Sequence, residues 1–185
     1  MDNIYEKCPV LKNDTITLRK LELNDAEELL KCYSDIDAVK FFNNDNCHGD
    51  DFHFTTIKQI ADAVNGWLYC YDIKDFVRMT IINNDSSELI GTVEMFNRGQ
   101  ADGYGIHGIL RIDLRSSFEK EKIICAIIDL ADKYFFKLFS VDFIMTKAIS
   151  DAHERIKALN NMGYMKAVNF ELENYYYKKC TNHDI

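Results

Sequence analysis

The sequence predicts an α/β (α+β) fold with a mixed, mostly antiparallel central sheet of about seven strands flanked by helices. Two apolar runs, residues 76–82 and 89–96, flank an Asn/Asp/Ser segment at 83–88, and this pattern predicts a β-hairpin. Farther along, a strand, a long amphipathic helix and another strand follow one another over residues 109–145, the order of a crossover between parallel strands. The chain has 185 residues, of which 47% are apolar, and this suits one domain over residues 1–185.

The first elements follow from local patterns. Apolar and polar residues alternate over residues 15–21, which predicts a strand. Asn24 stands at an N-cap position with Glu27 three residues later, and this predicts a helix over 25–34. Residues 35–51 are rich in Asn and Asp and are expected to form an exposed loop or a short helix.

The remaining elements are placed by hydrophobic periodicity. Apolar residues at helical spacing predict a helix from Ile57 to about Asn65-Gly66, a long helix through 123–135, and a helix capped by Asp151 and ended by Gly163. A strand is expected at 141–145, and two closing strands are expected within 164–180.

Charge and composition exclude several classes of partner. With 22 Lys and Arg against 30 Asp and Glu, the net charge is −8. The chain has no basic block, so no nucleic-acid or anionic-membrane partner is expected. The longest apolar run, residues 123–128, is far shorter than the roughly 20 residues that span a bilayer. The N-terminus resembles no secretory signal, and six cysteines without a C-x-x-C pair are read as reduced thiols, so a cytoplasmic location is expected.

Four segments carry a family resemblance. Residues 16–19 (Ile-Thr-Leu-Arg) with 23–29 look like the first strand and helix, and 89–93 (Leu-Ile-Gly-Thr-Val) like the third strand, of one acetyltransferase branch. Residues 156–164, ending in Gly163-Tyr164, are similar to its last helix. The chain therefore resembles the GNAT superfamily of N-acetyltransferases, in the branch that acetylates ribosomal-protein N-termini, over about residues 15–179.

The resemblance implies one acetyltransferase-like domain that transfers an acetyl group from acetyl-CoA to a primary amine, either a protein N-terminus or a small amine. The fourth and fifth family strands would splay apart around the pantetheine arm, and the loop after the fourth strand would bind the diphosphate at a helix N-terminus. The implied cofactor-binding residues are Leu110, Ile112 and Leu114 on the strand and Arg115, Ser116, Ser117, Phe118, Glu119, Lys120, Glu121 and Lys122 on the loop. Glu94 or His107 would be the catalytic base, with Asp113 as a further proton-relay candidate.

The sequence departs from the family pattern in two places. The family loop carries two glycines, and here those positions hold Phe118 and Lys120 or, one residue later, Glu119 and Glu121. In the last helix, Ala152 and Arg155 stand where the family often has Asn and Ser, and Leu159 stands where a tyrosine acid sometimes lies. The alternative is therefore a catalytically silent GNAT-fold protein that binds a small ligand or a protein partner.

Other patterns favour simpler interpretations. Residues 47–53 contain Cys47, His48, Asp50, Asp51 and His53 but no second half-site, so a solvated loop is favoured and no metal is expected; His48, Asp50 or Asp51 would serve acceptor recognition. Residues 103–108 spell G-x-G-x-x-G, but a strand follows where a dinucleotide site needs a helix, which favours a loop. The Tyr175–Tyr177 run suits a closing strand, and an exposed tyrosine edge would suit a homodimer contact.

Overall fold

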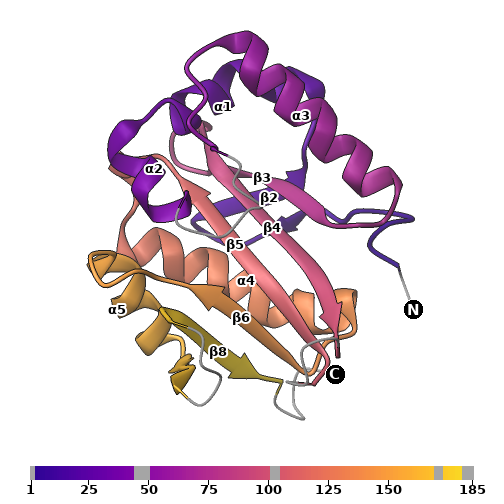
Figure 1. Ribbon diagram of the computed structural model, residues 1–185, viewed down its shortest axis with the longest axis vertical. Helices are drawn as coiled ribbons and strands as arrows, with labels where there is room; N and C mark the ends of the chain where they lie inside the picture. Colours follow the sequence, from indigo (N-terminus) through magenta and orange to yellow (C-terminus); the bar gives the residue numbers. More distant parts are fainter. Residues whose placement is uncertain (1–2, 44–50, 101–104, 169–172, 181–185) are drawn as a thin grey trace.

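In the part of the chain that the structure describes, the fold is one eight-stranded sheet with helices on both faces (Figure 1). The computed structural model describes residues 3–43, 51–100, 105–168 and 173–180. The sheet order is β1-β2-β3-β4-β5-β6-β8-β7, and β5–β6 is the parallel pair among antiparallel neighbours. The strands are β1 (Leu11–Lys12), β2 (Ile16–Lys20), β3 (Val77–Asn83), β4 (Leu89–Gly99), β5 (His107–Leu114), β6 (Phe143–Lys147), β7 (Met165–Lys166) and β8 (Tyr175–Lys179). The predicted fold class is confirmed, with two-residue strands at each edge of the sheet.

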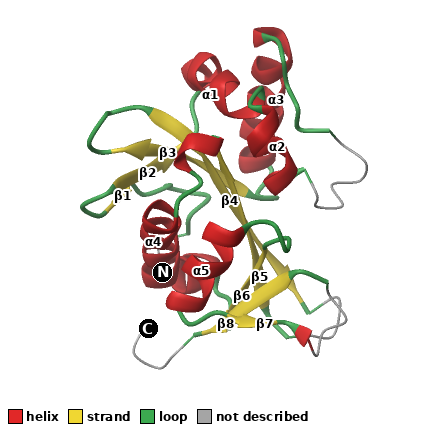
Figure 2. Cartoon of the chain, turned by 90° about the vertical axis from the view of Figure 1, so that its left-hand side faces the viewer, coloured by secondary structure: helices red, strands yellow, loops and turns green. Residues whose placement is uncertain are grey.

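Five α-helices cover the two faces of this sheet within the described ranges. They are α1 (Ala26–Tyr33), α2 (Ile36–Phe42), α3 (Ile57–Asp72), α4 (Glu121–Phe139) and α5 (His153–Asn161). Figure 2 shows α4 and α5 together on one face and α1, α2 and α3 over the other. The crossover from β5 through α4 to β6 has the predicted parallel arrangement.

The two faces of the central strands differ in chemistry. One face contributes Val93, Met95, Leu110 and other apolar side chains to the main core, which also holds the buried stripe of α4. The opposite face carries charged and hydroxyl side chains on β3, β4 and β5 beneath α1, α2 and α3. An aromatic cluster from these helices and the segment before α3 covers the polar row; it comprises Tyr33, Phe42, Phe52, Phe54 and Trp67.

The helix predicted to stop near Asn65-Gly66 instead continues to Asp72, so that prediction is wrong. Ile60, Val64, Trp67 and Tyr71 are all buried and lie on one helical stripe. A glycine inside a helix costs only about 1 kcal/mol relative to alanine, less than the burial of two aromatic side chains contributes. The apolar stripe therefore carries the helix through Gly66.

Two predicted N-caps are also wrong. Asn24 lies inside a 3₁₀ turn, Leu23–Asp25, and the backbone amide of Glu22 donates to Asp25 Oδ2 at 2.9 Å. The last helix begins at His153 after Ala152, so Asp151 lies outside it. At its other end, Gly163 has a φ of +79°, and the predicted left-handed stop is confirmed.

The predicted glycine-bearing loop gives way to β5 earlier than expected. β5 begins at His107, so Gly108 belongs to the strand. Gly103 and Tyr104 lie outside the described residues. A strand thus follows the G-x-G-x-x-G pattern, as the sequence predicts, and this context does not suit a dinucleotide site.

Candidate functional site

β5 and β6 pair along only half of β5. Their register runs from His107 opposite Phe143 to Leu110 opposite Thr146. β5 continues to Leu114, and its other edge stays paired with β4 to the end. On the β6 side, residues 111–114 therefore face no strand within the described ranges, which leaves main-chain groups available to a ligand.

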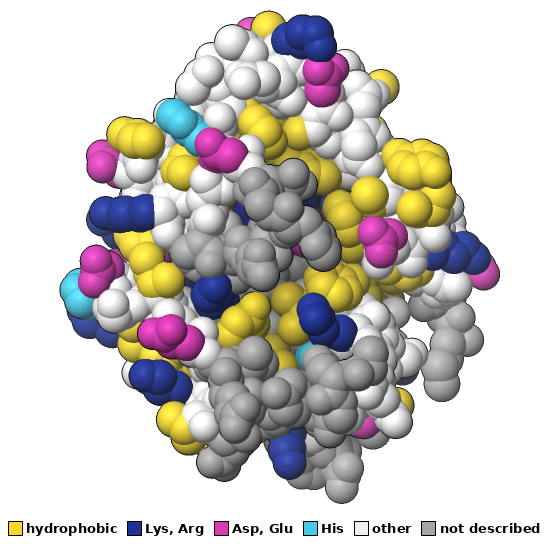
Figure 3. Space-filling view, viewed as in Figure 1, with side chains coloured by type: hydrophobic (Ala, Val, Ile, Leu, Met, Phe, Trp, Pro, Cys, Tyr) yellow, Lys and Arg dark blue, Asp and Glu magenta, His cyan; other side chains and the backbone are white. Residues whose placement is uncertain are grey.

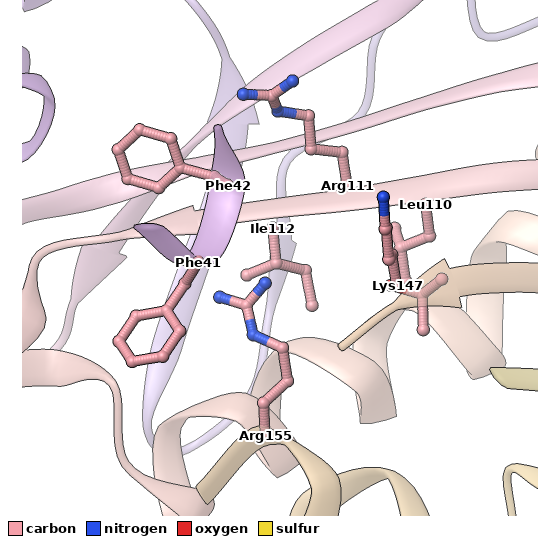
Figure 4. A pocket seen from close by; sticks show the side chains of 8 residues that line it. Phe41, Phe42, Leu110, Arg111, Ile112, Lys147 and Arg155 are labelled. Carbon is pink, nitrogen blue, oxygen red and sulfur yellow. The ribbon is translucent and has the colours of Figure 1, made fainter. Parts of the chain in front are cut away.

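A small pocket of ≈ 10 Å³ lies where the two strands part (Figure 4). Its floor comes from β5 and β6, its roof from α2, and one wall from α5. Ligand sites usually measure about 300–1,000 Å³, so the roof or the wall has to give way before a cofactor arm enters. The lining residues are Phe41, Phe42, Leu110, Arg111, Ile112, Thr146, Lys147 and Arg155.

The two faces of β5 serve different layers. The predicted cofactor residues Leu110, Ile112 and Leu114 have their side chains in the main core with α4. Leu110 and Ile112 also line the pocket, whereas Leu114 does not. Arg111 and Asp113 point to the opposite face, where Arg111 Nε donates to Asp113 Oδ1 at 2.8 Å and the guanidinium lies 4.0 Å from the centre of the Phe52 ring.

A buried polar network lies beneath the aromatic cluster. The Tyr33 hydroxyl donates to Asp113 Oδ2 at 2.7 Å and lies 2.8 Å from Thr92 Oγ1. Arg78 Nη1 donates to the Tyr33 hydroxyl, to Thr92 and to Asp113, and its guanidinium lies 4.0 Å from the centre of the Trp67 ring. Burial would raise the pKa of Asp113, but Arg111 and Arg78 outweigh it, so that pKa lies below its usual value.

The two predicted catalytic residues lie in different surroundings. Glu94, on β4, accepts a hydrogen bond from Arg78 Nη2, and its side chain is 12% exposed, so it is the part of the network that reaches solvent. His107 is buried at the paired end of β5, stacked on Phe143 with its Nδ1 2.9 Å from the Gly105 carbonyl oxygen. Because the pocket begins three residues farther along β5, the structure brings Arg111 rather than His107 to it.

The predicted diphosphate loop is a tight turn, and most of its amides already donate hydrogen bonds. Ser116–Phe118 form a 3₁₀ turn, and the Ser116 amide donates to Asp35 Oδ2 at 2.8 Å. Asp35 is also the N-cap of α2, accepting from the Asp37 amide. Burial would raise the pKa of Asp35, but the hydrogen bonds from Ser116 and from the start of α2 hold it below its usual value. One carboxylate thus ties the loop to the helix that roofs the pocket.

Two glutamates occupy the rest of this region. Glu119 is buried and accepts from Arg155 Nε and Nη2, both at 2.8 Å. The amide of Glu121, the first residue of α4, donates to Glu154 Oε2 at 3.0 Å, and this hydrogen bond lowers the pKa of Glu154. The chain thus places its own carboxylates where the resemblance would place a diphosphate.

The other predicted loop residues lie at the surface. Arg115 stacks on Phe118, with 5.3 Å from its guanidinium carbon to the ring centre, and its Nη1 lies 3.5 Å from Glu88. Ser117, Lys120 and Lys122 are exposed, so they are open to a ligand that approaches the N-terminus of α4.

Pocket-lining residues outside the predicted set are Phe41, Phe42, Lys147, Thr146, Arg111 and Arg155. A sequence signal exists for Arg155. Arg155, Ala158 and Leu159 have the i, i+3, i+4 spacing of a buried helical stripe, and all three are buried. A charged residue on such a stripe needs a partner, and here the partner is Glu119.

No group of three or more metal-ligating side chains gathers within the described ranges. Of the residues weighed as ligands or acceptor contacts, Cys47, His48 and Asp50 lie outside those ranges, whereas Asp51 accepts from Asn43 and from the His53 amide. On the face seen in Figure 3, the Lys and Arg side chains of the described residues lie scattered among acidic and apolar ones. No helix in the described part of the chain is long and apolar enough to cross a membrane.

Several solved structures share this architecture. A GNAT-family acetyltransferase from Bacillus anthracis matches with a TM-score of 0.69 and 15% identity, covering 92% of this chain and 98% of that one. The microcin C7 self-immunity acetyltransferase MccE, solved with acetyl-CoA and AMP, matches with a TM-score of 0.67 and 16% identity, covering 90% and 93%. Ribosomal-protein acetyltransferases from two Vibrio species also match. The chain has the fold of the GNAT N-acetyltransferases, and the resemblance drawn from its sequence is confirmed.

A curated sequence relative agrees with the fold. The uncharacterized N-acetyltransferase YoaA of Bacillus subtilis (strain 168) is 24% identical over 178 residues, which cover 95% of this chain and 93% of the relative. The similarity thus extends over nearly the full length of both proteins. No family model matches the chain.

Proposed function

We propose that this chain is an acetyl-CoA-dependent N-acetyltransferase acting on a primary amine. The observation that carries the proposal is the half-paired β5, with a pocket where its pairing to β6 ends. MccE, which has the same fold, is solved with acetyl-CoA. A bound acetyl-CoA would supply the thioester, which an amine attacks directly.

The residues present fit the pantetheine arm better than they fit the diphosphate. The open edge of residues 111–114 offers main-chain donors and acceptors to an arm that contains two amides. The apolar ring faces of Phe41 and Phe42 line the side toward α2. At the diphosphate end, the buried Glu119 and the helix-capping Glu154 would have to be displaced or rearranged.

The reaction needs an unprotonated amine. Its nitrogen forms the new bond to the thioester carbonyl carbon, the carbon–sulfur bond breaks, and the sulfur leaves as the thiol after taking up a proton. In this proposal Glu94 is the base, because it is the solvent-reaching member of the buried network and Arg78 fixes its orientation. His107 remains the second candidate, although it lies at the closed end of β5.

We propose an α-amine acceptor, either a protein N-terminus or a small molecule. An α-amino group has a pKa of about 7.7–8.0 and a lysine side chain about 10.4, so at neutral pH far more of the α-amine is ready to attack. The similarity to a ribosomal-protein-S5-alanine acetyltransferase supports a peptide N-terminus. The acidic net charge of −8 favours acceptors that carry additional positive charge.

The test combines binding and turnover. Acetyl-CoA at 100 times its dissociation constant stabilises a fold by about 2.7 kcal/mol, which raises the melting temperature by about 5–10 °C at this chain length. ATP and pyrophosphate serve as controls for nonspecific anion binding. Incubation with peptides that begin with alanine or serine, followed by mass spectrometry, then detects the acetylated product.

The engaged loop amides and the Glu119–Arg155 pair favour a second candidate, a GNAT-fold protein that has lost the transfer reaction. A melting temperature unchanged by acetyl-CoA, together with no acetylated product, would establish that alternative and exclude the proposed enzyme.

A further inference from the structure

The backbone of the predicted diphosphate loop has few donors left for an anion. The Arg115 and Ser116 amides donate to Ile90 O and Asp35, and the Glu121 amide donates to Glu154. The amides of residues 118–120 donate to carbonyl oxygens within the turn itself. Among residues 115–122, the Ser117 and Lys122 amides have no hydrogen-bond partner in the described part of the chain. These two amides leave most oxygens of a diphosphate without a donor, so a diphosphate bound here needs a side-chain donor as well.

Arg155 is the side chain best placed to supply it. It lies on α5, it lines the pocket at the end of the β5–β6 pairing, and its guanidinium reaches the loop through Glu119. Figure 4 shows its guanidinium pointing from α5 into the space between β5 and α2. Arg155 therefore lies between the pocket, which the pantetheine arm would enter, and the loop with Glu119, which the diphosphate would approach.

The contact with Glu119 has the form of an anion-recognition contact. Two parallel N–H groups of the guanidinium meet the two oxygens of one carboxylate, both at 2.8 Å. The same fork fits two oxygens of a phosphate, because guanidinium binds both groups in bidentate geometry. Both side chains are nearly inaccessible, 4% exposed for Arg155 and 6% for Glu119, so the pair is shielded from competing water.

We propose that Arg155 binds the diphosphate of acyl-CoA, and that Glu119 occupies the same fork until the diphosphate replaces it. The inference rests on the proposed function and deepens it, since it identifies how a loop without glycines holds its anion. Glu119 is released from the fork beside the exposed Lys120, which offers it a new cation at the surface. Bond making and breaking are confined to hydrogen bonds, so the exchange leaves the covalent chemistry unchanged.

The exchange predicts opposite effects for the two partners. Glu119→Gln keeps the shape of the side chain, removes its charge and frees the fork, so it tightens CoA binding by about fivefold or more. Arg155→Met keeps the aliphatic stem, removes the fork and weakens CoA binding by about tenfold or more. Pantetheine has the same arm without the diphosphate or the nucleotide. Its dissociation constant is therefore expected to change by less than about twofold in either variant.

Asp25→Asn is the matched control. Arg19 and Asp25 form a second bidentate pair, at 2.8 and 2.6 Å, between β2 and the turn before α1, away from the pocket-lining residues. This variant changes the net charge as much as Glu119→Gln does, so it reports any general gain in anion affinity. We expect its CoA affinity to match that of the wild type.

The experiment is calorimetric titration of wild type and the three variants with CoA and with pantetheine, after a melting curve of each. Equal effects on both ligands, or no effect of Glu119→Gln, would overturn the role of Arg155. Should Arg155→Met fail to fold, Glu119→Gln decides alone, because it retains the arginine. If the wild type binds no CoA and transfers no acetyl group, the proposed function fails. In that case a gain of CoA binding in Glu119→Gln would still support the exchange of Glu119 for the diphosphate. If Glu119→Gln also binds no CoA, the exchange is refuted too.

Discussion

The Tyr33 hydroxyl is the centre of the buried network, and its removal gives the most direct test of that network. It contacts Asp113, Thr92 and Arg78 at 2.7, 2.8 and 2.7 Å, and the side chain is fully buried. In Tyr33→Phe the ring keeps its packing against Phe42 and Trp67, so the change isolates the hydroxyl. A hydrogen bond to a charged group contributes about 1.5–3 kcal/mol and a neutral one about 1 kcal/mol.

Part of this loss is compensated. Arg78 Nη1 already lies 3.0 Å from both Asp113 and Thr92, so these groups keep one another as partners. We therefore expect a net loss of about 2–4 kcal/mol in the free energy of unfolding. At about 2–4 °C per kcal/mol for a chain of this size, the melting temperature falls by about 5–15 °C.

Urea unfolding at pH 7, followed by circular dichroism, measures the free-energy change. Tyr164→Phe is the matched control, since the Tyr164 hydroxyl is also buried but donates one hydrogen bond, to Asp132 at 2.9 Å. The reasoning would be refuted if Tyr33→Phe cost no more than Tyr164→Phe. An unchanged slope of free energy against urea would show that both variants unfold from the same native state.

Three further perturbations test separate parts of the structure. Gly66→Ala should raise the free energy of unfolding by about 0.5–1 kcal/mol, because a Cβ there meets nothing within 4 Å. Gly91→Ala should abolish soluble expression, because its Cβ would lie 2.0 Å from the Asp113 carbonyl oxygen. Comparable stability of the two variants in urea would contradict this contrast. The pKa of Asp113 is lowered in the fold, so its ionised form stabilises the protein above about pH 4, and that stabilisation is lost as the pH falls. Between pH 5 and 3 the urea midpoint should therefore drop more steeply in the wild type than in Asp113→Asn. Parallel curves for the two proteins would argue against a stabilising role of the Asp113 carboxylate. Asp35→Ala removes the α2 cap and the acceptor of the Ser116 amide together, so hydrogen exchange should accelerate at Ser116 and in the first turn of α2 alike; faster exchange at one of them alone would show that the two are held separately.

Patterns local in sequence predicted most of the fold. The alternation along β2 and the apolar stripe of α4 each mark the face that the same element buries. The turn composition between β3 and β4 marks the exposed connection of a hairpin. The end of α3 was harder to predict because the deciding residues, Trp67 and Tyr71, are buried by contacts with distant parts of the chain. The burial of Trp67 and Tyr71 outweighs the low helix propensity of Gly66.

The candidate site was less predictable, since its charged residues act in pairs that are distant in sequence. Glu119 and Arg155 are 36 residues apart, and Tyr33 and Asp113 are 80 residues apart. Glu119, Arg155 and Asp113 are of residue types that, considered alone, are typical of exposed positions. The family resemblance located the loop, but the absence of glycines gave no indication that carboxylates of the chain itself would engage its amides.

The order of the strands also bears on how the chain folds during synthesis. From β1 to β6 each strand pairs with the one made just before it, so the sheet can grow in step with the ribosome. β8 breaks this order, because it lies between β6 and β7. A nascent chain that ends before residue 175 presents an open edge on β6 and leaves β7 without its partner strand. Until residues 175–179 emerge, that edge is the surface on which a chaperone, or a second nascent chain, would act.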